Sequence, residues 1–198
     1  ADYADDAARL MDAIGWKSAR VLGMSFGGMV AQEFVLRHPA KVERLALACT
    51  SSGGRGGASY PLHTVMHLKG DERARRLIAL DNTTRDNAWI TAHPEQYALM
   101  LKMMGGQDPF ENEPGREQGM RRQLEARIGH DTWERLPQIK CPVLIAAGKY
   151  DGIAPPENQE RMAAQMPHAI LKYFEGGHIF LFENPAAYPA IIEFLAAA

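Results

Sequence analysis

Three residues of this chain have side chains that together could activate a nucleophile: Ser25, Asp151 and His178. A serine hydroxyl attacks a carbonyl carbon when a base takes its proton, and the base needs a carboxylate that fixes its tautomer and stabilises the imidazolium. Each of the three follows an apolar run that predicts a β-strand. Because open parallel sheets place their sites at the carboxyl ends of the strands, we expect the three side chains to meet at one edge.

Ser25 stands in the pattern Gly-x-Ser-x-Gly, formed by residues 23–27. Its flanks predict a strand, a sharp turn and a helix, with the serine exposed above the sheet on a strained backbone. We expect Gly23 and Gly27 to be required because a Cβ at either would crowd the packing of helix on strand. The amides that open the helix favour developing negative charge. A plain glycine-rich turn is the alternative, but the strand–turn–helix context favours a nucleophile.

The segments around Ser25 predict alternating helices and strands. Apolar residues on one face indicate a helix over residues 2–14, and a second helix is predicted over residues 28–37. Apolar runs over residues 19–22 and 42–48 predict buried strands. Strand, helix and strand at this spacing form a βαβ unit, which requires a parallel sheet.

The strand pattern stops between about residues 61 and 136, where apolar residues recur at helical spacing. Glycine and proline divide this segment into three to five short helices. We therefore expect a helical cap of residues 53–136, inserted into a core of residues 1–52 and 137–198. The candidate pocket residues are Met24, Trp89, Met100, Met103 and Met104. The methionines belong either to a plain core or, because methionine adapts to irregular ligands, to a pliable wall over the pocket.

Strands return in the last third of the chain, over residues 142–147 and 169–174, with a helix over residues 155–166 between them. Asp151 and His178 lie in the loops that follow these two strands. Asn184 is expected to cap a final helix that begins at Pro185. The predicted fold class is α/β, with four parallel strands, flanking helices and the inserted cap.

The composition is that of an ordinary globular protein. The chain has 198 residues, 46% hydrophobic and 23% charged, with a net charge of −2. This charge indicates no nucleic-acid or anionic-membrane partner. Cys49 and Cys141 adjoin apolar runs and are predicted to be buried free thiols. No apolar run reaches membrane-spanning length and no signal peptide is visible, so we expect a cytoplasmic location.

The combined motifs resemble the α/β-hydrolase superfamily, specifically its capped esterase, enol-lactonase and haloperoxidase-like branch. The matching pieces are residues 23–28, the strand 42–50, Cys141-Pro142 before a strand ending in Gly148-Lys149-Tyr150-Asp151, and Gly176-Gly177-His178. The resemblance covers essentially the whole chain, and the insertion is similar to the family's cap. It implies that Ser25 is the nucleophile, Asp151 the orienting acid and His178 the base. It also implies that the backbone N–H of Phe26 is one oxyanion donor, and it implies no cofactor.

Each motif also has a plainer interpretation. Asp151 could be a turn residue, since Asp-Gly is a common turn pair, and His178 could be a loop histidine. His63 and His67 have the spacing of metal ligands, but no glutamate follows His63 and no third ligand is evident. The Ser/Gly loop over residues 51–57 fits no phosphate-binding pattern. We therefore expect neither a metal nor a phosphate site.

The chain departs from this family before the serine, where only one helix precedes the nucleophile strand. The chain also opens at Ala1 without an initiator Met, which suggests a processed or truncated chain. By resemblance, the first four strands are missing, together with the loop that normally donates the second oxyanion N–H. Loss of one such donor costs on the order of 10²–10³ in rate in other hydrolases. An apolar edge strand is an association hazard, so we expect a homo-oligomer or a separate N-terminal segment to cover it.

These features predict a serine hydrolase that acts on a small ester or lactone through an acyl-enzyme. One alternative keeps the fold and changes the chemistry: a cofactor-free haloperoxidase or perhydrolase, in which peroxide replaces water. The other alternative is a catalytically impaired fragment or a binding and assembly module, because the second oxyanion donor would be missing.

Overall fold

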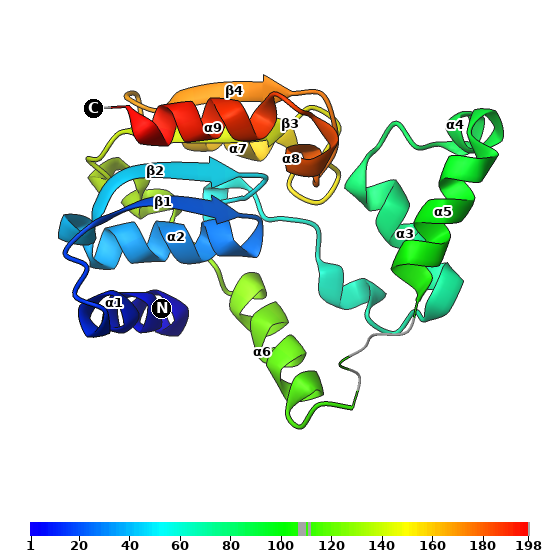
Figure 1. Cartoon of the computed structure of the whole chain (residues 1–198), viewed down its shortest axis with the longest axis horizontal. Helices are drawn as coiled ribbons and strands as arrows, with labels where there is room; N and C mark the ends of the chain where they lie inside the picture. Colours follow the sequence, from blue (N-terminus) through cyan, green and yellow to red (C-terminus); the bar gives the residue numbers. More distant parts are fainter. Residues whose placement is uncertain (107–109, 111, 198) are drawn as a thin grey trace.

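A computed structural model of the chain describes residues 1–106, 110 and 112–197. Its centre is a four-stranded sheet whose neighbouring strands all pair in parallel and stand in chain order. The strands are β1 (Ala19–Met24), β2 (Val42–Ala48), β3 (Val143–Gly148) and β4 (Ile170–Phe174). This architecture confirms the predicted fold class, and all four strands point the same way in Figure 1.

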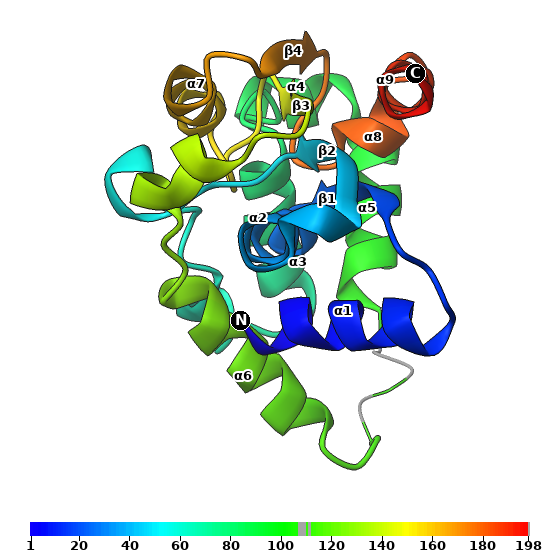
Figure 2. The ribbon, with the colours of Figure 1, turned by 90° about the vertical axis from the view of Figure 1, so that its left-hand side faces the viewer.

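Helices cover both faces of the sheet (Figure 2). On one face lie α1 (Asp2–Ala13), α2 (Phe26–Arg37) and α7 (Pro156–Gln165), which share a buried apolar cluster with alternate residues of β2 and β3. On the other face, α8 (Phe180–Glu183) and α9 (Ala187–Ala196) share a second cluster with the remaining residues of those strands. β3 and residues 45–48 of β2 are therefore buried and apolar, because their side chains alternate between two cores, whereas Glu43 near the start of β2 is exposed.

The connection between β2 and β3 is helical, as predicted. It contains α3 (Gly70–Asp81), α4 (Asn87–Ala92), α5 (Pro94–Gly105) and α6 (Arg116–Ile128), besides the short 3₁₀ helices Gly54–Gly56, Leu62–Val65 and Trp133–Gln138. Figure 1 shows α3, α4 and α5 beyond the carboxyl ends of the strands. Ser25 directly follows the carboxyl end of β1. The expected division at residues 52 and 136 into core and cap stays a prediction.

Most element boundaries lie within two residues of the sequence-based expectation, and the starts of two helices need comment. The helix after Ser25 begins at Phe26, directly after the serine, rather than at Gly28. The final helix begins at Ala187, and the short helix α8 precedes it. Asn184 lies between the two helices, where its Oδ1 accepts a hydrogen bond from the N–H of Ala186 at 3.0 Å. Asn184 therefore closes the turn before the helix instead of capping the helix itself.

Strand β1 forms one edge of the sheet and is less buried than predicted. Its residues alternate between half-buried and exposed as far as Leu22, which is 39% exposed. Among the described residues, β1 pairs with β2 alone. An apolar groove runs along this edge between α1, β1 and α2, lined in part by Trp16, Val21 and Phe34. The strand's outer N–H and C=O groups and this groove are surfaces that folded proteins normally cover.

The expectation that a second copy or a separate segment covers the edge of β1 stays a prediction. Unpaired strand edges and exposed apolar surface favour association, so the chain should form dimers or remain marginally stable on its own. Light scattering at micromolar concentration measures the association state. A well-folded monomer would contradict the expectation.

Helix α1 is held to α2 by an exposed ion pair as well as by apolar contacts. The Asp5 carboxylate accepts hydrogen bonds from Arg37, from Nε at 2.9 Å and from Nη2 at 2.6 Å. The Nε2 atom of His38 lies 2.8 Å from the same carboxylate. These contacts, Arg37 first, lower the pKa of Asp5 below its ordinary value of 3.8. Because the folded-state pKa is depressed, the contribution to stability is present above pH 3.8 and is lost as the pH falls below that value.

We expect Asp5→Asn to lower the melting temperature slightly at pH 7, and the difference from wild type to shrink as the pH falls below about 4. Asp6→Asn is the matched control, since the partner of Asp6 among the described residues is Arg9 on its own helix. Thermal melts of the three proteins between pH 3 and pH 7 measure the effect. A gap between Asp5→Asn and wild type that persists at low pH would show that the ion pair is not its source.

Candidate active site

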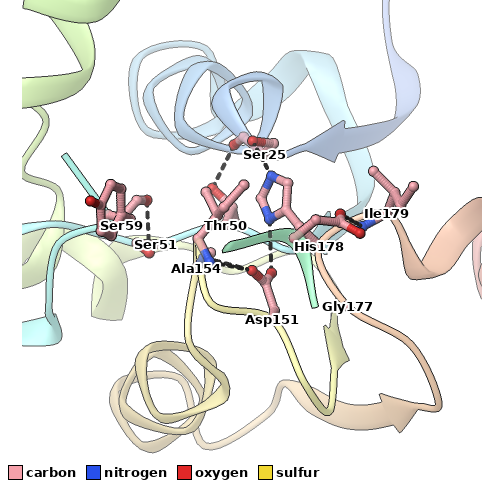
Figure 3. Close-up of polar contacts among 12 residues, drawn as sticks. Ser25, Thr50, Ser51, Ser59, Asp151, Ala154, Gly177, His178 and Ile179 are labelled. Atoms are coloured by element: carbon pink, nitrogen blue, oxygen red, sulfur yellow. Dashed lines mark hydrogen bonds and ion pairs between the residues drawn. The ribbon is translucent and has the colours of Figure 1, made fainter. Parts of the chain in front are cut away.

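Ser25 sits on a sharp turn between β1 and α2, with backbone angles φ 51° and ψ −119°. A positive φ is strained for a residue with a side chain, so the predicted strained conformation is confirmed. Two hydrogen bonds hold it: the Ser25 N–H donates to Ala48 O at 2.9 Å, and the Thr50 hydroxyl donates to Ser25 O at 2.8 Å. Both partners lie at the end of β2 or just after it, so the neighbouring strand fixes the turn (Figure 3).

Of the two glycines expected to be required at this turn, one has the expected role and the other does not. A Cβ on Gly23 would lie 2.7 Å from the Cβ of Ala31, so the predicted crowding is confirmed there. A Cβ on Gly27 would meet nothing within 4 Å, so that prediction is wrong. Gly27 faces the open groove beside β1. The crowded helix position is Gly28, where a Cβ would lie 2.6 Å from the Cβ of Thr50.

Asp151 follows β3 and is only 3% exposed. Its Oδ1 accepts hydrogen bonds from the N–H groups of Ile153 and Ala154, both at 2.8 Å. Its Oδ2 lies 2.8 Å from Nδ1 of His178. The carboxylate therefore does both things that the sequence left open, since it closes the turn with one oxygen and contacts the histidine with the other.

His178 follows β4 and connects the other two side chains (Figure 3). Its Nε2 lies 2.8 Å from Ser25 Oγ, and its Nδ1 contacts Asp151. An ionised carboxylate can only accept, so Nδ1 carries the proton and Nε2 is left to accept from the serine hydroxyl. The expected convergence of the three side chains is observed, in the geometry that lets an imidazole take a proton from a hydroxyl.

The N–H of Phe26 opens α2 directly beside Ser25. As the first residue of the helix, Phe26 has no acceptor within the helix for this group. No other acceptor takes it among the described residues. An unsatisfied N–H at a helix N-terminus next to Ser25 is suited to stabilise negative charge on an oxygen atom.

The five candidate pocket residues differ in how deeply they are buried. Met24 ends β1 and is half-buried beside Ser25, and Trp89 is half-buried and stacks on His93 with ring centroids 4.7 Å apart. Met100 is half-buried on α5. Met103 and Met104 are 75% and 45% exposed, so neither lines an enclosed pocket in this structure.

The exposure of the two methionines follows from the position of α5. This helix packs against α3 and α4, and α3 lies between it and the sheet in Figure 1. Helical spacing therefore placed Met103 and Met104 correctly on a helix, but one that lies on the outer side of the insertion.

Other groups near the sheet show no second reactive centre. Cys49 and Cys141 are free thiols, as predicted, but only Cys49 is fully buried and Cys141 is partly exposed; burial raises the pKa of both. Within the described parts of the chain, no group of three or more His, Cys, Asp or Glu residues could hold a metal ion. None of the helices described is long and apolar enough to span a membrane. The sequence analysis gave no role to Asp81 and Glu183, which bond to the His178 loop, or to Arg85, which joins them.

The chain is similar to known proteins over nearly its whole length. The sequence profile of the alpha/beta hydrolase fold matches residues 1–185. RutD of Caulobacter sp. (strain K31), named provisionally as a carbamate hydrolase, is 29% identical over 201 residues, which cover 97% of this chain and 70% of the relative. A poly(3-hydroxyalkanoate) depolymerase of Ectopseudomonas oleovorans is 29% identical over 189 residues, covering 95% of this chain and 64% of the relative.

A solved structure shows the same similarity. The crystal structure of a hydrolase from Pseudomonas aeruginosa PA01 matches with a TM-score of 0.74 and 25% identity, over 98% of this chain and 71% of the other. The chain thus spans between 64% and 71% of the lengths of these three proteins.

The two helix glycines give a matched pair of substitutions. We expect Gly28→Ala to cost about 1–3 kcal/mol, because its Cβ would push Thr50 away from the Ser25 carbonyl. Gly27→Ala should leave stability unchanged or raise it by up to about 1 kcal/mol, since alanine favours the helix and has space. Urea unfolding of both variants measures these changes. Equal losses would show that the contact between Gly28 and Thr50 does not constrain the turn.

Proposed function

The chain belongs to the α/β-hydrolase fold family, and from this premise we propose that it is a serine hydrolase that cleaves a small ester or lactone through an acyl-enzyme. The observation that carries the proposal is the continuous contact from Ser25 through His178 to Asp151, with both distances at 2.8 Å. A buried carboxylate, an oriented imidazole and a strained serine are the parts that acyl transfer requires.

In the first half of the proposed reaction, Ser25 Oγ attacks the acyl carbon while its proton passes to Nε2 of His178. Asp151 stabilises the resulting imidazolium through Nδ1–H and stays ionised. The N–H of Phe26 and the N-terminal end of α2 face the negative charge that develops on the acyl oxygen. The imidazolium then gives its proton to the leaving alkoxide, which departs and leaves an ester on Ser25.

In the second half, His178 takes a proton from water, and the resulting hydroxide attacks the acyl carbon of the Ser25 ester. Collapse of the second tetrahedral intermediate releases the acid, and the proton held by His178 returns to Ser25 Oγ. In each half His178 first accepts a proton and then donates it, so one alignment of His178 with Ser25 serves the whole cycle.

The names of the relatives support acyl transfer and leave the substrate open. One relative is named provisionally as a carbamate hydrolase and the other as a poly(3-hydroxyalkanoate) depolymerase. These two names point to different substrates, and cleavage of a bond at a carbonyl carbon is the reaction type that they have in common. Esters and lactones are the class in which we place the substrate of this chain.

We expect wild-type protein to hydrolyse p-nitrophenyl acetate and to react with a fluorophosphonate at Ser25. Ser25→Ala should reduce the ester turnover by about 10⁴-fold or more and abolish labelling, because the nucleophile is gone. Ser18→Ala is the matched control, as the Ser18 hydroxyl is bonded to Glu43 on the surface of the core.

Absorbance of released p-nitrophenol and intact mass after labelling provide the two readouts. An inert wild-type protein would favour the binding-module alternative. Turnover that survives Ser25→Ala would place the reaction elsewhere. Peroxide-dependent halogenation without ester turnover would favour the haloperoxidase alternative.

A further inference from the structure

Three successive backbone N–H groups of the histidine loop are bound by only two acidic residues. The Gly177 N–H donates to Glu183 Oε2 at 2.9 Å. The His178 N–H donates to the backbone oxygen of Asp81 at 2.6 Å, and the Ile179 N–H donates to Asp81 Oδ1 at 3.2 Å. Every amide around the imidazole is therefore satisfied from outside its own loop, and two of the three are satisfied by Asp81.

A guanidinium joins these two acidic residues. Arg85 contacts Asp81 Oδ2 through Nη1 at 2.5 Å and Glu183 Oε1 through Nη2. Asp81 and Arg85 are 5% and 8% exposed, so the charges are largely shielded from water. We call Asp81, Arg85 and Glu183 the carboxylate–guanidinium bridge. Its members come from the end of α3, the loop before α4 and the end of α8.

The same end of α3 also holds the loop that carries Asp151. The Gly152 N–H donates to Leu80 O at 3.0 Å, and the Thr83 N–H donates to Tyr150 O at 2.9 Å. The approach is close, since a Cβ on Gly152 would lie 2.7 Å from Leu80 O. Residues 80–85 of the insertion thus contact the loops of both Asp151 and His178.

The energetics argue that the bridge is more than a stabilising ion pair. Burial raises the pKa of Asp81, and the nearby Glu183 charge raises it too, while Arg85 opposes both. Shielding such charges from water costs about as much as their attraction returns, so a buried ion pair adds little net stability. The arrangement instead fixes the orientation of the histidine loop. Each carboxylate accepts a hydrogen bond from Arg85 with one oxygen and from a backbone N–H of the histidine loop with the other.

We propose that the carboxylate–guanidinium bridge is a positioning device that holds the His178 loop at the distance from Ser25 that proton transfer requires. This inference rests on the proposed function, because it assigns His178 the role of base. Asp81, Arg85 and Glu183 touch neither substrate nor Ser25 in this role and act through the loop. The insertion that forms the cap thereby also aligns the base.

Glu183→Ala removes the acceptor of the Gly177 N–H and one partner of Arg85. We expect kcat for p-nitrophenyl acetate to fall about 10- to 100-fold, with KM changed less than about twofold, as for a misplaced catalytic group. The rate of fluorophosphonate labelling at Ser25 should fall by a similar factor. Glu183→Gln keeps a carbonyl acceptor for Gly177 and should restore most of both rates.

Glu33→Ala is the control, because Glu33 on α2 makes a two-point contact with Arg135 in the 3₁₀ helix Trp133–Gln138, away from the histidine loop. It should lower stability without changing kcat or the labelling rate at a temperature where all variants are folded. If Glu183→Ala lowers the melting temperature as Glu33→Ala does and keeps wild-type kcat, the bridge is merely structural and the proposal is overturned.

Two further measurements separate this proposal from the proposed function. Amide hydrogen exchange at residues 177–179 and the Nδ1 proton resonance of His178 report the loop whether or not Ser25 reacts. In Glu183→Ala we expect exchange at these amides to accelerate at least tenfold and the resonance to broaden or shift. An inert wild-type protein would overturn the proposed function alone, while unchanged exchange and resonance in Glu183→Ala would overturn the positioning role.

Discussion

The parallel pairing of the four strands in chain order is the constraint on which the site depends. Parallel strands end at one edge of the sheet, and Ser25, Asp151 and His178 each follow such an end. Ser25 and His178 are 153 residues apart in sequence, and their side chains meet at 2.8 Å. Because β2 and β3 are buried on both faces, a shift in pairing would expose apolar side chains, so the two cores fix the register that brings the site together.

The sequence predicted what local patterns can encode. Apolar runs and helical spacing gave the order of the elements, and the Gly-x-Ser-x-Gly pattern gave the strained turn at Ser25. The error at Gly27 shows the limit of such reasoning. A motif indicates that small residues are needed near the turn, but it does not show which neighbour requires them. The side chain of Thr50, which excludes a Cβ at Gly28, lies just after the neighbouring strand β2. The exposure of Met103 shows the same limit, since helical spacing does not say what a helix face packs against, and its pocket role stays a prediction.

The carboxylate–guanidinium bridge could not be predicted from sequence patterns. Asp81 and Arg85 stand four residues apart, which is also the spacing of an ordinary surface pair on a helix. Glu183 is 98 residues from Arg85 and belongs to a four-residue helix that the sequence did not predict. Only the fold of the insertion back onto the sheet shows that Asp81 and Arg85 are buried and that both carboxylates bond to one loop.

The insertion therefore has two parts with different constraints. Residues 80–85 bond to the loops of Asp151 and His178, so a change of length or direction there would move both side chains relative to Ser25. Helix α5 packs mainly against α3 and α4, so its outward residues, such as Met103, can change without reaching those loops. A fold built this way can vary the outer surface of its insertion while the inner end of α3 keeps the base aligned.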